Sequence, residues 1–171
     1  TVDVSGAVGG GDAGTLFVTA TGPGAAVHLD GVVKGGATTG NRQGSAVLDI
    51  ATADNISALN GKLNQGGFRE LRDIRVRSGD LLIAGSDALA NRPADVITAR
   101  HVKLSADQGS ITVGGTIDAS DAGGGGTIEL NAMNDLVLAA GSFLFANGVS
   151  GNADPAAAYS HGGRVELSSR T

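Results

Sequence analysis

Residues 95–138, DVITARHVKLSADQGSITVGGTIDASDAGGGGTIELNAMNDLVL, contain a series of short runs rich in β-branched residues. Apolar and polar residues alternate within these runs; Val102 and Leu104, for example, flank Lys103. Alternation with period two directs one set of side chains inward and the other outward, as in a half-buried strand. The Gly, Asn, Asp and Ser residues between the runs leave too little chain for a crossover helix. The sequence therefore predicts a strand-and-turn unit that is repeated along most of the chain.

Short strands, small corners and outward charges favour a stacked coil. Lys103, Glu129 and Glu166 all fall on the outward positions of their runs. We therefore expect an all-β fold, a parallel β-helix. With about 20 residues in each coil, the chain would form roughly eight coils. A β-sandwich of two sheets is the alternative architecture.

The first half of the chain adds further strands and one interruption. Strands are predicted at Thr15–Ala20, at residues 26–29 and at Ser45–Ile50, and a last one at residues 164–168. Residues 54–71 form a helical insertion, with the helix near residues 54–66. Its apolar residues, Ile56, Leu59 and Leu63, recur at helical spacing, Asp54 or Asn55 caps its start, and Gly66 and Gly67 end it.

Composition limits the classes of function that the chain can have. Its 171 residues make a single β-helical segment, residues 1–171, which we expect to be part of a much longer protein. The net charge is −5 and no basic stripe is present, so a nucleic-acid partner is not expected. No apolar run approaches the roughly 20 residues of a membrane-spanning helix, so membrane insertion is not expected either. Cysteine is absent, which excludes disulfides and thiolate metal sites.

Catalytic and metal-binding residues are not predicted. The nearest acidic residues in sequence are Asp118, Asp121, Glu129 and Asp135, and solvated turns and outward strand positions explain all four. Neither a metal nor a cofactor is expected, because no histidine has another His or Cys at ligand spacing. The glycine runs lack the residue order of a calcium-binding repeat and of a phosphate loop, so they are interpreted as corners with positive φ. The three isolated histidines are His28, His101 and His161.

Two long polar segments are the predicted interaction surface. Residues 147–163, NGVSGNADPAAAYSHGG, would project from the coil and carry Tyr159 and His161. Residues 84–94 form the second segment, with Arg92 at its tip. An aromatic ring beside polar groups can stack on a sugar ring, so Tyr159, His161 and Arg92 are the candidate ligand-binding residues. A decoration without a ligand is the alternative.

Four blocks of the sequence resemble the filamentous-haemagglutinin-like exoproteins, which Gram-negative bacteria secrete by a two-partner route. The resemblance covers a little under half of the chain, and residues before about 70 match far more loosely. The blocks are SGDLLIAG at 78–85, ARHVKLSADQGSITVGGTIDAS at 99–120, GGTIELNAMNDLVLAAGS at 125–142 and GGRVELSS at 162–169.

The resemblance implies a right-handed parallel β-helix within an extracellular or cell-surface adhesin of a Gram-negative bacterium. Such a segment would be a non-enzymatic structural shaft used in attachment or biofilm cohesion. The parent protein would be exported by an outer-membrane transporter. The secretion-domain motifs typical of the family, NPNGI and NxNG, are not visible, so an interior segment is expected.

Three other functions fit the same coil. One is a module that binds exopolysaccharide or a host-surface glycan through its loops. Another is a β-helical polysaccharide lyase or hydrolase, and a third is the stalk of a contact-dependent toxin-delivery protein.

Overall fold

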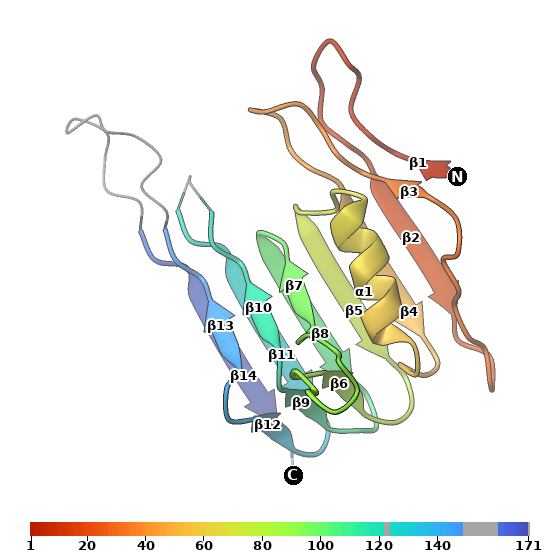
Figure 1. Cartoon of the computed structure of the whole chain (residues 1–171), viewed down its shortest axis with the longest axis vertical. Helices are drawn as coiled ribbons and strands as arrows, with labels where there is room; N and C mark the ends of the chain where they lie inside the picture. The colour runs from red at the N-terminus through yellow and green to blue at the C-terminus, as the bar shows by residue number, and fades with distance from the viewer. Residues whose placement is uncertain (122–123, 149–160, 171) are drawn as a thin grey trace.

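The protein is a parallel β-solenoid of about five turns with three sides (Figure 1). Its structure, a computed structural model, describes residues 1–121, 124–148 and 161–170. The long side is a single six-stranded sheet. In spatial order its strands are β14 (Arg164–Ser169), β11 (Thr127–Ala132), β8 (His101–Ala106), β5 (Leu71–Val76), β4 (Ser45–Ile50) and β2 (Thr15–Ala20).

Short strands form the other two sides of the coil. One short side contains β13 (Phe143–Phe145), β10 (Thr116–Asp118) and β7 (Val96–Thr98), and further along it β3 (Val33–Lys34) pairs with β1 (Val2–Asp3). The other short side contains β12 (Leu136–Leu138), β9 (Ile111–Val113) and β6 (Leu81–Ile83).

All pairs between these strands are parallel, so the predicted β-helix is confirmed and the β-sandwich alternative is wrong. The predicted size of the coil is also wrong. The first residues of the long strands, numbered 15, 45, 71, 101, 127 and 164, pair in succession and differ by 30, 26, 30, 26 and 37. Each coil contains up to three strands. The prediction of 20 residues in each coil and eight coils was wrong because it took a shorter strand-and-turn unit for a whole coil.

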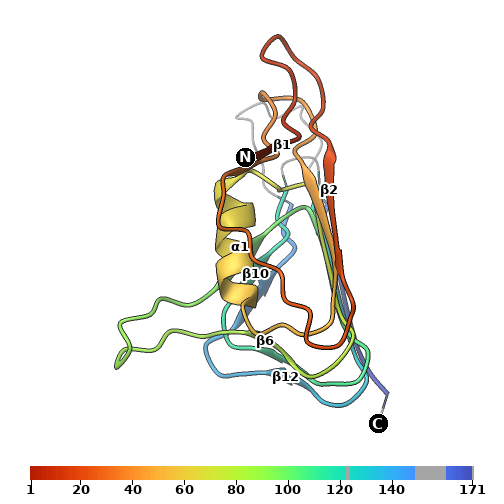
Figure 2. The same cartoon turned by 90° about the vertical axis from the view of Figure 1, so that its right-hand side faces the viewer.

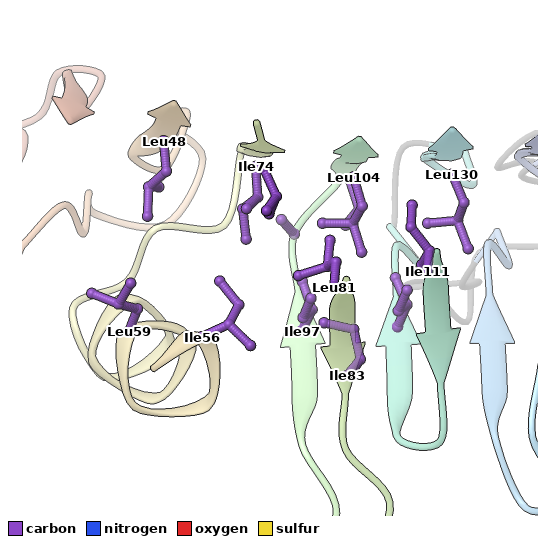
Figure 3. Close-up of a cluster of buried hydrophobic side chains, with 14 of the residues drawn as sticks. Leu48, Ile56, Leu59, Ile74, Leu81, Ile83, Ile97, Leu104, Ile111 and Leu130 are labelled. Carbon is purple, nitrogen blue, oxygen red and sulfur yellow. The ribbon is translucent and has the colours of Figure 1, made fainter. Parts of the chain in front are cut away.

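The core consists of columns of aliphatic side chains that run along the axis. Because all six long strands share one register, their second, fourth and sixth residues point inward on every coil. The fourth-position column is buried completely in its middle, and Figure 3 shows part of it facing the side chains of the other two sides. This column contains Val18, Leu48, Ile74, Leu104, Leu130 and Leu167.

The outward residues and most predicted strands are confirmed. Lys103, Glu129 and Glu166 lie in one outward column, and Ile128 pairs directly with Val165. Residues 26–29 do not form the expected strand, although Val27 and Leu29 still pack against the core.

The predicted helix is confirmed as α1 (Ile56–Gln65), with Asn55 at its N-cap and Gly66 at its C-cap. It buries Ile56, Leu59 and Leu63. α1 occupies the place of a strand on the short side, between β3 and β7 (Figure 1). A helix is wider than a strand and offers no ladder hydrogen bonds, so side chains must connect it to its neighbours.

Buried polar groups make that connection. Arg72 projects into the core from β5 and is fully buried. Its guanidinium donates to Asn60 Oδ1, to Asn64 Oδ1 (3.2 Å) and to the Phe68 carbonyl (2.9 Å). Asn60 Nδ2 donates in turn to the Val96 carbonyl on β7 at 2.6 Å. The network therefore links α1 to both the long side and the next strand of its own side.

Arg72 has no acidic partner among the described residues, and its Nε has no hydrogen-bond partner there. Burial lowers its pKa to about 10 because the charged form loses its hydration. Its neighbours in the inward column are Ala46 and Val102. The small side chain of Ala46 leaves room for the guanidinium.

Glycine is required where successive coils touch at a corner. A Cβ on Gly126 would lie 1.8 Å from the Arg100 carbonyl oxygen, and one on Gly163 would lie 2.0 Å from the Gly126 carbonyl oxygen. Both glycines immediately precede a long strand. The predicted positive φ holds for Gly10, Gly11 and Gly124 in the glycine runs.

Truncating the core column should destabilise the protein. We expect Ile74→Ala to lower the free energy of unfolding by about 3 kcal/mol, because the cavity lies between packed columns. The measurement is equilibrium urea unfolding. Leu82→Ala is the control: Leu82 is 50% exposed, and its truncation should cost less than about 1 kcal/mol. Equal losses for the two variants would contradict the assigned core.

Removing a side-chain amide from the buried network should also lower the free energy of unfolding. We expect Asn60→Leu to destabilise the protein by about 3 kcal/mol, because a buried cation loses its partner. Adding Arg72→Met to that variant should restore stability in urea unfolding, since the unpaired charge is removed. Asn134→Leu, at an exposed position, is the control. If Arg72→Met destabilises both backgrounds equally, the network does not couple the two residues.

Candidate functional surface

The outer face of the long side carries a group of polar side chains around a surface hollow. The hollow has a volume of about 840 Å³ and crosses strands β4, β5, β8 and β11. Alternation within each strand places the first, third and fifth residues on this face. Lining it are Val47, Asp49, Asp73, Arg75, Lys103, Ser105, Asp107, Glu129, Asn131, Met133 and Arg170, with Leu48, Ala106 and Ala132.

Two bidentate ion pairs neutralise much of the charge around this hollow. Arg77 Nε and Nη2 donate to the two carboxylate oxygens of Asp49, each at 2.7 Å. Arg75 Nε lies 3.0 and 2.9 Å from the two oxygens of Asp107. The hydrogen bond from Arg77 lowers the pKa of Asp49 and holds it ionised. Both pairs join residues on neighbouring coils, so they run along the axis.

Asp73 is a half-buried carboxyl group on the same face. Partial burial on the outer face raises its pKa, while the charge of Lys103 on the next strand opposes that shift. Glu129, one strand further along the same column, raises the pKa again. Lys103 Nζ lies 4.0 Å from Glu129 Oε2. The three side chains thus form a row of alternating charge.

This face can bind polar ligands through hydrogen bonds. Ser105 and Asn131 sit in register on β8 and β11, and Asn131 Oδ1 accepts a hydrogen bond from Ser168 Oγ at 2.8 Å. Hydroxyl and amide groups spaced by about 4.8 Å along a sheet suit a ligand that carries many hydroxyl groups.

The acidic residues singled out in the sequence do not gather at one place. Asp118 ends β10 on a short side, whereas Glu129 projects from the long side. Asp121 lies at the corner between them, with its carboxylate 3.6 Å from Arg100 Nε. Asp135 precedes β12 on the third side. Their placement agrees with the interpretation as turn and outward positions.

The candidate ligand residue Arg92 lies on a loop at the corner between β6 and β7. Its backbone forms an antiparallel bridge with Asp87, with N–O distances of 2.8 and 2.9 Å. At the base of the loop, Asp95 Oδ2 accepts hydrogen bonds from the Ala84 N–H (3.0 Å) and from the Ser57 hydroxyl. Figure 2 shows this loop extending away from the coil.

The other two candidates belong to the segment 147–163. Tyr159 lies outside the described residues, as does most of that segment. His161 is exposed just before β14, and its carbonyl accepts a hydrogen bond from the Gly125 N–H at 2.7 Å. Arg92 and His161 lie at different corners of the coil, so the structure does not bring them together.

The histidines are not grouped in the described part of the chain. His101 Nδ1 is 2.9 Å from Thr127 Oγ1 on the adjacent strand. Within residues 1–121, 124–148 and 161–170, no three His, Cys, Asp or Glu side chains are placed to hold a metal ion.

Phe17 is an exposed aromatic residue that the sequence analysis did not single out. It sits on the outward third position of β2 and is 72% exposed, in the same column as Asp73 and Lys103. Its place in TLFVTA, between inward Leu16 and Val18, was a signal that alternation alone could have detected.

Comparison with protein-family models, curated proteins and solved structures found no match to this chain. Within the described residues, no helix has the length and hydropathy needed to cross a membrane.

The two carboxylates of the outer face should respond to pH in opposite ways. At pH 7 we expect Asp49→Asn to destabilise the protein by about 0.5 kcal/mol, because the ion pair is lost. Asp73→Asn should instead stabilise it, because the folded state disfavours the charged form. Urea unfolding at a series of pH values measures both effects.

The direction in which each carboxylate changes the free energy of unfolding with pH follows from proton linkage. The lowered pKa of Asp49 gives stability that is present above about pH 3.8 and is lost as the pH falls through the folded value. The raised pKa of Asp73 means that stability falls as the pH rises from 3.8 through the folded value. At a pH below the folded and unfolded pKa values of each aspartate, each variant should have the same free energy of unfolding as the parent chain. Effects of the same sign for the two variants would contradict the assigned environments.

Proposed function

We propose that this chain is a non-enzymatic structural shaft segment of a large secreted or cell-surface bacterial adhesin, used in attachment or biofilm cohesion. The observation that carries the proposal is the unbroken register of the six-stranded long side. Every strand of that sheet pairs in parallel with its neighbours over its full six residues. Force along the axis would therefore be shared by many backbone hydrogen bonds.

The side chains support the same mechanical role. Aliphatic columns exclude water along the axis, and ion pairs such as Arg75–Asp107 cross from one coil to the next on the outside. Neighbouring coils are thus connected by backbone, core and surface contacts together. A coil of this kind makes a stiff spacer that holds a binding tip away from a cell.

The four sequence blocks that resemble filamentous-haemagglutinin-like exoproteins supply the adhesin part of the proposal. Those blocks contain the buried positions of β8 and β11, two interior strands of the long side. A partner at the cell would be the outer-membrane transporter of the parent protein.

Surface labelling of the source bacterium tests the location. Antibodies raised against the purified chain should label intact cells or material shed from them. Antibodies against a cytoplasmic protein are the control for leakage. Labelling that appears only after the cells are permeabilised would overturn the proposal.

Incubation with bacterial and host polysaccharides tests the absence of catalysis. We expect no newly released ends when the purified chain is incubated with each polysaccharide. Release of ends that is abolished by Asp73→Asn would overturn the structural role and identify a carbohydrate-active enzyme.

A second candidate function, glycan binding, is favoured by Phe17. The exposed Phe17 ring on the outer face of the long side can stack on one sugar of a polysaccharide chain. Ser105 and Asn131, three and four strands away on the same face, can bond hydroxyls of other sugars of that chain. Retention of the chain on a polysaccharide column, lost on Phe17→Ser and kept on Leu82→Ser, would support this function. Retention that neither substitution changes would contradict binding at this face.

A further inference from the structure

A polar groove lies at the corner where the chain enters the long side. Its floor is formed by the short connections before β5 and β8, residues 66–70 and 99–100. Its walls belong to the longer connections before β4 and β11, at residues 35–44 and 120–121, and Figure 1 shows residues 35–44 extending beyond the floor. The groove has a volume of about 380 Å³. It crosses three coil steps of about 4.8 Å each, roughly 14 Å along the axis.

Hydrogen bonds within the chain hold the groove in shape. On the floor, the Arg100 N–H donates to the Arg69 carbonyl at 2.7 Å. In one wall, Gln43 Oε1 accepts a hydrogen bond from the Ala37 N–H (2.9 Å), and Gln43 Nε2 donates to the Ala37 carbonyl (3.1 Å). The polar side chains of the groove therefore need little rearrangement to bind a ligand.

Two arginines of the groove have N–H groups for a ligand. Arg69 is exposed, and within the described residues its side chain has neither an ion pair nor a hydrogen bond. Arg100 Nη1 lies 3.8 Å from Glu70 Oε1, and Arg100 Nε lies 3.6 Å from Asp121 Oδ2. Both distances are longer than an N–H···O hydrogen bond. The guanidinium of Arg100 can therefore donate to a ligand while it stays near these carboxylates.

The charges of the groove favour an anion with a single, well-separated charge. Glu70 and Asp121 place two carboxylates beside Arg100, and they would repel a polymer that carries dense sulfate or phosphate groups. Arg69 can bind one carboxylate in the bidentate geometry that guanidinium groups favour. A chain whose carboxylates are separated by uncharged groups would fit both conditions.

The remaining side chains suit a sugar polymer better than a peptide. Thr98 and Ser120 contribute hydroxyl groups and Asn41 contributes an amide, all of which can bond sugar hydroxyls. Among the described residues that line the groove, Ala99 is the sole apolar side chain, and it is buried. The groove therefore offers no pocket for an apolar side chain of a peptide.

We propose that this corner groove binds a polysaccharide that contains uronic acid units. A sugar carboxylate binds Arg69, and hydroxyl groups of the same chain bind Arg100, Thr98 and Ser120. This inference goes beyond the proposed shaft function, because a stiff spacer needs no ligand on its own coils. The groove is also separate from the outer face that carries Phe17.

Titration calorimetry at low ionic strength tests the proposal, with polygalacturonate as the probe. Methyl-esterified polygalacturonate is the matched ligand control, because it has the same sugar chain without the charge. We expect Arg69→Gln to weaken binding about tenfold, since a charge-assisted hydrogen bond is lost. Glu70→Gln should strengthen binding, because a like charge is removed from the groove.

Lys34→Gln is the control for net charge. Lys34 is an exposed cation on a short side, and it does not line the groove. Its substitution should leave the affinity for polygalacturonate unchanged. Arg69 is also exposed, so both variants should keep the Tm of the parent chain.

Several results would overturn the proposal. These are an absence of binding to polygalacturonate, equal affinity for the charged and the esterified polymer, and equal affinities for Arg69→Gln and Lys34→Gln. Tighter binding of polyglutamate or of dextran sulfate would assign the groove to an acidic peptide or a sulfated polymer instead. None of these measurements depends on surface labelling of cells, so this inference and the proposed shaft function can fail separately.

Discussion

Register is the constraint on which the rest of the structure depends. Side chains alternate with period two, so a slip of one residue in any long strand would turn its core column outward. The parallel pairing of six strands over six residues each fixes the columns, the corners and the outer face together. Gly126 and Gly163 show how tight this constraint is, because consecutive coils meet there too closely for any side chain.

The one break in strand geometry shows what replaces the ladder when it is absent. Where α1 takes the place of a strand, the connection to β5 and β7 passes through Arg72, Asn60 and Asn64. Charged groups are rarely buried without a counter-charge, and here amide and carbonyl oxygens alone accept from the Nη1 and Nη2 atoms of the guanidinium, while its Nε has no partner among the described residues. The polar contacts fix the helix at a single position, which apolar packing alone would define less sharply.

Sequence patterns were sufficient for most of the strands, the parallel coil and the helix, because each depends on local periodicity and on glycine at corners, but they wrongly predicted a strand at residues 26–29. Coil length was predicted wrongly because one coil joins a six-residue strand to short strands such as β9 and β10, and periodicity within a strand does not say how many strands make a turn. Alternation in LRDIRV places Arg72 on the same face as Ile74 and Val76, but its hydrogen-bond partners could not be predicted, because they come from α1 and Phe68 and not from its own strand. The exposure of Phe17 could have been predicted, because alternation in TLFVTA already placed it outward.

The same periodicity gives the solenoid two distinct surfaces with different tolerance to change. Outward columns can vary, because Asp73, Lys103 and Glu129 face solvent and are held only by their charges. Inward columns tolerate less change, because residues such as Ile74 and Leu104 are fully buried among their neighbours. Aliphatic residues at exposed positions reduce solubility and promote edge-to-edge association. Alternation therefore keeps the aliphatic columns inside the coil and the charged columns on its surface.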